Sequence, residues 1–184
     1  VTGIGGTGVV TIGALLGMAA HIEGKGCSIL DQTGLAQKGG AVTTHVRIAN
    51  KPEDIQAVRI AAGGANLIVG CDLVTTASSD VRAKMRSDFT QAVVNTEETI
   101  TGAFTHDVDF RVPGKELHEL IAEATGETAS DFVPATQVAT ALLGDSIAAN
   151  LFMLGYAWQK GLVPVSAEAI DQAIELNGVA IAFN

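Results

Sequence analysis

Apolar residues recur with a helical period near the start of the chain. Between residues 8 and 23 they stand at i, i+3, i+4 and i+7, the spacing of one face of an amphipathic helix; they are Ile12, Leu15, Leu16, Ala19 and Ile22. The pattern stops at Gly24 and Gly26, and glycine commonly ends a helix. A helix is therefore predicted directly after the glycine-rich segment that opens the chain.

Strand patterns follow this predicted helix. Residues 42–48 alternate between apolar and polar side chains, which predicts a strand with one solvated face and places His45 and Arg47 on that face. Residues 66–71 form a continuous apolar run, a helix is expected from there to about residue 84, and another strand is expected at 91–95. Strand, helix and strand at this spacing predict parallel pairing with right-handed crossovers.

The remaining segments complete an α/β pattern. Residues 27–31 are predicted as a short buried strand, 33–40 as a polar loop, and a short strand is expected near 108–110. Helices are predicted over 115–124 and 135–160, with an extended segment at 131–134. A last helix is predicted from the N-cap Ser166 to Leu176, closed by Asn177-Gly178. We predict a three-layer α/β domain with a mainly parallel sheet, a Rossmann-like first half and a helical C-terminal segment that covers one face or forms an interface.

Composition narrows the function classes. The chain has 184 residues, 47% of them hydrophobic and 17% charged, which fits one well-buried domain. Its net charge of −9 offers no basic surface for nucleic acid, and no apolar run suits a membrane span, so we expect a cytoplasmic location. Cys27 and Cys71 lie far apart and outside any CxxC motif, which predicts free buried thiols and no iron–sulfur or zinc site in this chain.

The first glycines match a dinucleotide-binding fingerprint. In Gly3-Ile4-Gly5-Gly6-Thr7-Gly8, the first glycine of the motif permits a tight turn, the second allows close approach to a pyrophosphate, and the third allows helix and strand to pack closely. Asp31, 23 positions after Gly8, stands where an acidic residue would bond the ribose hydroxyls. This reading predicts an NAD- or FAD-binding dehydrogenase domain. Alternatively, the glycines reflect packing alone, or the helix N-terminus faces another anion.

A second glycine-rich loop changes this interpretation. The stretch TGLAQKGG, residues 33–40, follows Asp31 closely, and an NAD site does not require such a loop. Together, GIGGTGVVTIGALLGMAAHIEGKG and DQTGLAQKGGAVTTHVRIA resemble the gamma domain of the 2-oxoacid:ferredoxin oxidoreductases, most closely that of the fused bacterial indolepyruvate ferredoxin oxidoreductases. Residues 143–178 are similar to the C-terminal helices of that family. The chain begins only two residues before Gly3, where a full strand is usual, so we interpret residues 1–184 as a single domain excised from a longer chain.

The resemblance implies an enzyme that decarboxylates a 2-oxoacid such as pyruvate or indolepyruvate on thiamine diphosphate, passes electrons to ferredoxin and transfers the acyl group to coenzyme A. The family binds thiamine diphosphate and magnesium through Gly-Asp-Gly and a distant Asn, whereas Gly144-Asp145-Ser146 is followed too soon by Asn150. Thiamine diphosphate, magnesium and iron–sulfur clusters are therefore expected on partner domains. This chain is expected to be inactive alone and to work within an oligomer.

The functional surface is expected where both glycine loops emerge at the carboxyl ends of the strands. The candidate cofactor-binding residues are Gly3, Gly5, Gly6, Gly8, Gln37, Lys38, Gly39 and Gly40. They are expected to pack against the thiamine-bearing domains or to form an entry for coenzyme A, with Lys38 free to meet a phosphate. Alternatively, Lys38 is a solvated loop lysine. No catalytic residue and no metal ligand is expected here, and a third interpretation is a structural assembly module that binds no small molecule.

Other polar residues have simpler explanations. A joint contact of His45 and Arg47 with an anion competes with a solvated or interface pair, which we favour. Asp72 is expected to cap the helix that follows it, and Asn150 is expected to be a buried amide that bridges backbone groups.

Overall fold

Helices and strands alternate along the chain in the computed structural model, which describes residues 1–33, 40–98, 113–126, 128–179 and 181. The strands are β1 (Thr2–Ile4), β2 (Gly26–Thr33), β3 (Ala41–Ala49), β4 (Leu67–Gly70), β5 (Gln91–Asn95) and β6 (Ser130–Val133). The helices are α1 (Val9–Ile22), α2 (Leu73–Thr76), α3 (Ser79–Arg82), α4 (Gly114–Thr125), α5 (Ala135–Leu143), α6 (Ala149–Gln159) and α7 (Ala167–Asn177), with 3₁₀ turns η1 (Pro52–Asp54) and η3 (Ser146–Ala148).

The described strands form one six-stranded sheet in the order β2-β3-β1-β4-β5-β6. Strands β1, β4, β5 and β6 pair in parallel, whereas β3 is antiparallel to both β1 and β2. The prediction of a mainly parallel sheet is confirmed. The first half differs from a simple Rossmann unit because β2 pairs with β3 along its whole length, from Gly26↔Ala49 to Thr33↔Val42, and β3 takes the place beside β1.

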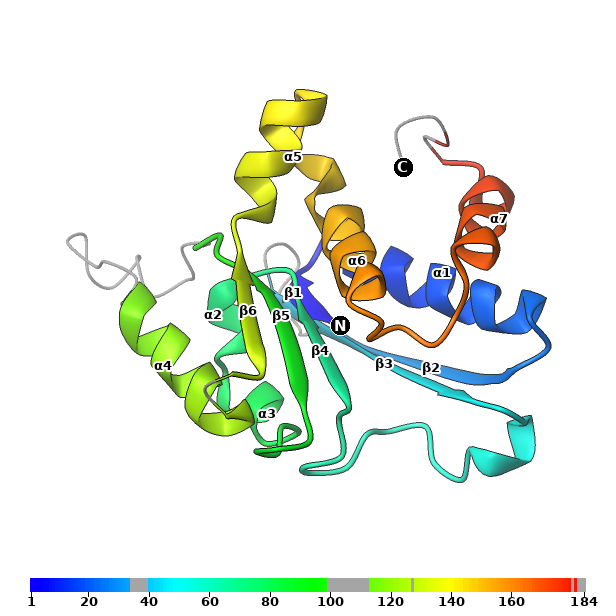
Figure 1. The fold of residues 1–184 in the computed structure, drawn as a ribbon, viewed down its shortest axis with the longest axis horizontal. Coiled ribbons are helices and arrows are strands. Elements are labelled where there is room, and N and C mark those ends of the chain that lie inside the picture. Colours follow the sequence, from blue (N-terminus) through cyan, green and yellow to red (C-terminus); the bar gives the residue numbers. More distant parts are fainter. Residues whose placement is uncertain (34–39, 99–112, 127, 180, 182–184) are drawn as a thin grey trace.

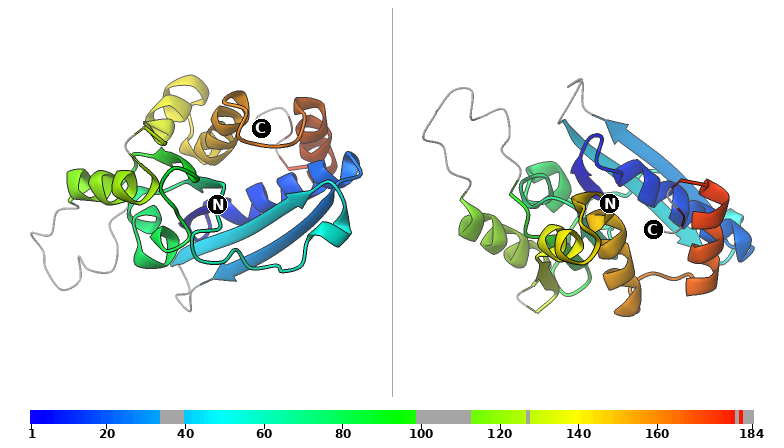
Figure 2. Two further views of the ribbon diagram at one scale, coloured as in Figure 1. Left: turned by 60° about the horizontal axis from the view of Figure 1, so that its bottom comes forward. Right: turned by 90° about the horizontal axis from the view of Figure 1, so that it is seen from above.

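Two helical layers cover the sheet (Figures 1 and 2). Helices α1, α6 and α7 pack on one face, over Val69 and Val93, and α2, α3 and α4 pack on the other, over Ile68 and Val94. Consecutive residues of one strand thus enter different cores, as expected for parallel strands that are buried on both faces. The predicted three-layer architecture is confirmed. Helix α5 leaves the carboxyl edge of the sheet and stands away from it (Figure 1).

Local capping explains where the elements begin and end. The carboxylate of Asp72 accepts a hydrogen bond from the Thr75 backbone N–H at 2.8 Å and begins α2, as predicted. The expected helix that runs to residue 84 is divided into α2 and α3, and the helical pattern over 135–160 breaks where Gly144 takes a left-handed φ of 77°. Ser166 caps α7 through the Ala169 N–H at 3.2 Å, as predicted. The strand expected near 108–110 lies outside the described residues.

The two cysteines differ in exposure. Cys71 is buried, as predicted, and this burial raises the pKa of its thiol to about 12. Cys27 is exposed, so the prediction of a second buried thiol was wrong: β2 is an edge strand and is covered less completely than the strands inside the sheet. Among the described helices, none combines the length and the apolar character that crossing a membrane requires.

Candidate functional site

The glycine-rich turn after β1 leads directly into α1. Gly6 and Gly8 have φ values of 87° and 98°, which glycine adopts without the penalty that a side chain would bring. The Thr7 hydroxyl donates to the Ile4 carbonyl at 2.7 Å and closes the turn. Gly8 occupies the N-cap position of α1, so the turn and the helix form one continuous unit.

Gly3 serves close packing between elements. A Cβ added at Gly3 would lie 2.8 Å from Val9 Cγ2 and 2.9 Å from Cys71 Cβ, distances that folded proteins avoid. The fingerprint assigns helix–strand packing to the third glycine and the tight turn to the first. Here the first glycine, Gly3, allows α1 and the end of β4 to approach β1, and the third, Gly8, supplies the turn.

Gly5 joins the two glycine loops. Its backbone N–H donates to the Gly40 carbonyl at 2.8 Å, and a Cβ at Gly5 would lie 3.3 Å from that oxygen and from Val42 Cγ2. In a dinucleotide site this second glycine leaves room for a pyrophosphate, whereas here it leaves room for a second segment of the same chain. The structure thus brings Gly40 to the turn that holds Gly3, Gly5, Gly6 and Gly8. Gln37, Lys38 and Gly39 lie outside the described residues.

Asn150, near the start of α6, holds the glycine turn in place. Its amide Nδ2 donates to the Thr7 carbonyl at 2.6 Å and lies 3.3 Å from the Thr7 hydroxyl oxygen. Asn150 is buried, so the prediction of a buried amide bonded to backbone is confirmed. Its target was not predictable from the sequence, because the two residues stand 143 positions apart.

Asn95 ties together the ends of neighbouring strands and was missed by the sequence reasoning. Its Nδ2 donates to the Cys71 carbonyl at 3.2 Å and to the Thr136 hydroxyl at 2.8 Å, which links the end of β5 to the end of β4 and to the start of α5. The available signal was an amide directly after the apolar residues of a predicted strand. The side-chain amide of Asn95, like that of Asn150, therefore donates its hydrogen bonds to other groups within the fold.

Asp31 is not placed for the ribose contact that its spacing suggested. Its carboxylate accepts a hydrogen bond from the Thr44 hydroxyl at 2.7 Å. It lies within β2, which is separated from β1 by β3, whereas a ribose-binding carboxylate belongs at the end of the strand beside the glycine turn.

His45 is buried, although its strand pattern predicted a solvated position. Only 1% of the residue is exposed. The Ile60 backbone N–H donates to Nδ1 at 3.0 Å, so the ring proton resides on Nε2 and is donated to Gln32 Oε1 at 2.8 Å. Burial, with a smaller contribution from the positive charge of Lys84, lowers the pKa of His45 to about 4. The prediction was wrong because the segment between η1 and β4 covers this face of β3.

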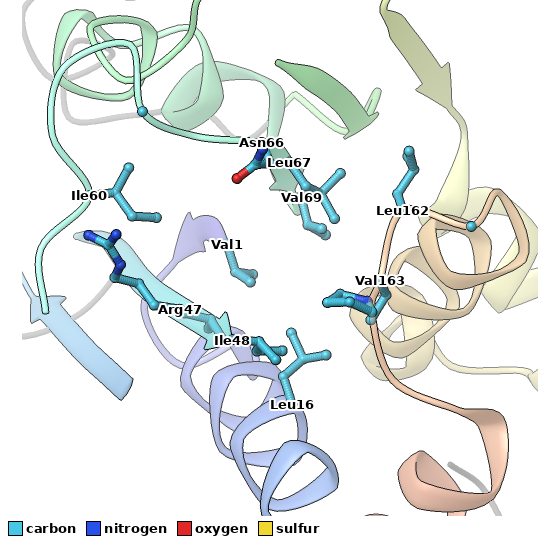
Figure 3. A pocket seen from close by; sticks show the side chains of 14 residues that line it. Val1, Leu16, Arg47, Ile48, Ile60, Asn66, Leu67, Val69, Leu162 and Val163 are labelled. Atoms are coloured by element: carbon cyan, nitrogen blue, oxygen red, sulfur yellow. The ribbon is translucent and has the colours of Figure 1, made fainter. Parts of the chain in front are cut away.

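A pocket of about 420 Å³ opens at the opposite end of β1, around Val1 (Figure 3). Most of the side chains that line it are apolar, including Leu16, Val46, Ile48, Leu67, Val69 and Val163, but Arg47, Asn66 and backbone groups make much of its surface polar. The pocket contains none of the predicted site residues. Its lining brings together no nucleophile and no acid–base pair, so we assign no catalysis to it.

The described residues do not fit a thiamine–magnesium centre. Among them, no three His, Cys, Asp or Glu side chains come together in a group that could hold a metal ion. The carboxylate of Asp145, from the Gly-Asp-Ser stretch, accepts the Ile147 N–H at 3.0 Å and caps η3. This carboxylate therefore serves as the cap of an exposed turn.

Comparison with known proteins identifies the family. The family model described as pyruvate ferredoxin/flavodoxin oxidoreductase matches residues 1–180. The chain is 29% identical to the indolepyruvate oxidoreductase subunit IorB of Archaeoglobus fulgidus over 95% of this chain and 82% of that one. It is 28% identical to the common subunit gamma of the pyruvate/ketoisovalerate oxidoreductases of Pyrococcus furiosus, over 94% and 82% of the two chains.

Solved structures share the fold. The pyruvate oxidoreductase subunit PORC of Thermotoga maritima aligns with a TM-score of 0.65 and 24% identity over 99% of this chain and 86% of that one. A keto/oxoacid ferredoxin oxidoreductase gamma subunit from Geobacter sulfurreducens aligns with a TM-score of 0.63 and 21% identity over the same shares of the two chains. The chain therefore belongs to the pyruvate ferredoxin/flavodoxin oxidoreductase family.

Proposed function

We propose that the chain is the gamma component of an indolepyruvate-type 2-oxoacid:ferredoxin oxidoreductase. The match to an indolepyruvate oxidoreductase subunit along 95% of the chain supports this type, together with the paired glycine loops. The complete enzyme oxidatively decarboxylates a 2-oxoacid to an acyl-coenzyme A and passes the electrons to ferredoxin. In this proposal thiamine diphosphate, magnesium and the iron–sulfur clusters belong to the other components, and residues 1–184 act as one domain.

The hydrogen bond between the Gly5 N–H and the Gly40 carbonyl is the observation that carries the role of this chain. It holds Gly40, which ends the second glycine-rich stretch, against the glycine turn at the carboxyl edge of the sheet, where ligands and partners of open α/β sheets usually bind. Asn150 braces that turn from α6 through the Thr7 carbonyl. We propose that the joined loops face the thiamine-bearing components and that Lys38 meets a phosphate of coenzyme A at the edge between them.

A dinucleotide-binding dehydrogenase is the weaker alternative. Two observations disfavour it. The Gly40 carbonyl accepts the Gly5 N–H where a pyrophosphate would lie, and Asp31 lies on β2, two strands from β1, with its carboxylate bonded to the Thr44 hydroxyl. Isothermal calorimetry with NAD, FAD and coenzyme A separates these alternatives. Binding of NAD or FAD at micromolar affinity overturns the proposal, and binding of coenzyme A supports it. If none of the three binds, the chain is an assembly module without a small-molecule ligand of its own.

Substrate preference tests the indolepyruvate assignment. Ferredoxin reduction by the complete oxidoreductase is measured with indolepyruvate, pyruvate and 2-ketoisovalerate, each with saturating coenzyme A. We expect the highest kcat/KM with indolepyruvate. A tenfold preference for either aliphatic substrate overturns the indolepyruvate type and leaves the family intact.

The coenzyme A contact is tested at Lys38. Lys38→Ala in the complete enzyme is expected to raise the KM for coenzyme A about tenfold, because one charge-assisted hydrogen bond to phosphate is lost. Lys115→Ala, at an exposed lysine of α4, is the matched control and is expected to leave that KM unchanged. An unchanged KM in Lys38→Ala rules out the phosphate role.

A further inference from the structure

An exposed apolar tip joins α5 to η3. Residues 140–147 are all exposed, and the tip carries Leu142, Leu143 and Ile147 with exposed fractions of 73%, 48% and 66%. Three large aliphatic side chains within six residues would add to a core if they were turned inward. Here they are exposed and do not belong to the small buried cluster at the junction of α5 and α6, which is Ala139, Ala148 and Ala149.

The tip has a defined shape. Gly144 ends α5 in a left-handed conformation, and its N–H donates to the Thr140 carbonyl at 2.9 Å. Asp145 then caps η3 through the Ile147 N–H at 3.0 Å, so the one charged side chain of the tip is engaged in the turn. A contact surface that is ordered before it binds loses less conformational entropy on association.

The tip is also continuous with the glycine loops. Asn150 follows Ile147 by three residues and donates to the Thr7 carbonyl in the glycine turn at 2.6 Å. Figure 1 shows α5 projecting from the carboxyl edge of the sheet, the edge to which the glycine turn belongs. A partner that covers the glycine loops therefore meets the tip with a fixed geometry.

Charge narrows the class of the partner. No Lys or Arg occurs from residue 116 to residue 159, so the sequence on either side of the tip lacks the basic residues that attract anionic lipid headgroups. A second copy of the chain is disfavoured because two molecules of net charge −9 repel each other. Apolar anchors beside a polar surface are typical of the centre of a protein–protein interface.

We propose that Leu142, Leu143 and Ile147 anchor this chain in an apolar groove of another component of the same oxidoreductase. The proposal rests on the proposed function, because that function supplies the companion component. The docking proposal adds a second contact to the proposed function. This contact lies outside the glycine loops and fixes how those loops face their neighbour.

Photo-crosslinking in the complete oxidoreductase tests this contact. Photoreactive benzoylphenylalanine replaces Ile147, and the cross-linked peptides are identified by mass spectrometry. A cross-link to a peptide from outside residues 1–184 supports the proposal. A cross-link to a second copy of residues 1–184, a cross-link to lipid or the absence of any cross-link overturns it.

Hydrogen exchange provides a second readout that does not depend on turnover. In the complete enzyme, the double variant Leu142→Ser with Ile147→Ser is expected to speed exchange of the amides in 140–147 at least tenfold. Leu176→Ser, at an aliphatic residue of α7 that is 68% exposed, is the matched control and is expected to leave that exchange unchanged. Fast exchange at 140–147 in the unmodified enzyme overturns the proposal. Because neither readout uses substrate, an enzyme that fails the indolepyruvate assay still reports on the docking contact.

Discussion

Removal of the Asn150 amide should loosen the glycine turn. In Asn150→Ala, the Thr7 carbonyl loses the donor that lies 2.6 Å away, and the Thr7 hydroxyl loses a contact at 3.3 Å. A buried carbonyl without a partner costs about 1–3 kcal/mol. Because Thr7 itself is exposed, water can replace part of the lost bond. We expect the free energy of unfolding to fall by about 1–2 kcal/mol, a decrease in Tm of about 2–4 °C for each kcal/mol.

Asn150→Asp should be more damaging than Asn150→Ala at neutral pH. The introduced carboxylate has no donor to offer the Thr7 carbonyl and places a negative charge against its oxygen in a buried position. Because the folded state disfavours the charged form, the pKa of that carboxyl is raised, and the excess destabilisation disappears as the pH falls and the carboxyl becomes protonated. Urea denaturation of the three proteins at pH 7 and pH 4.5 measures both effects, with hydrogen exchange at residues 5–9 as the local readout. Equal stability of Asn150→Ala and the unmodified chain, with unchanged exchange in the turn, refutes the bracing role.

Further substitutions probe the surroundings of the site. The pKa of His45 is about 4 in the folded state and about 6.5 in the unfolded state. The free energy of unfolding should therefore fall by about 1–3 kcal/mol as the pH falls from 6.5 to 4, because the unfolded state binds the proton first. His45→Asn should remove this pH dependence of the urea midpoint. Gly3→Ala should lower the free energy of unfolding by about 1–3 kcal/mol through overpacking. Gly6→Ala has open space around the new Cβ but a φ of 87°, and should lower it by about 1–2 kcal/mol. Gly3→Ala should therefore have the lower urea midpoint of the two. Asp72→Ala should cost about 0.5–2 kcal/mol in the same assay because α2 loses its N-cap.

Periodic segments of the chain were predictable because their pattern reflects burial on one or two faces. Helix α1 and the buried strand β4 lie where the apolar spacing placed them, and Ser166 and Gly178 bound α7 as their capping chemistry requires. The position of β3 between β2 and β1 was not predictable, because alternation along a strand does not specify its neighbour. His45 shows the same limit: alternation predicted a solvated face of the strand, and only the tertiary position of Ile60 reveals that this face is covered.

The glycine fingerprint predicts the local fold, and contacts within the chain show what its glycines do there. Features within the chain account for each glycine of the motif: the side chains of Val9 and Cys71 leave no room for a Cβ at Gly3, the Gly40 carbonyl would be in tight contact with one at Gly5, and Gly8 has a φ of 98°. The absence of a side chain that lets a backbone reach a pyrophosphate also lets it reach another loop. The motif thus indicates a strand, a tight turn and a helix, and the space beside its second glycine can hold either a ligand or another part of the chain. In this chain that space holds the Gly40 oxygen, 2.8 Å from the Gly5 nitrogen.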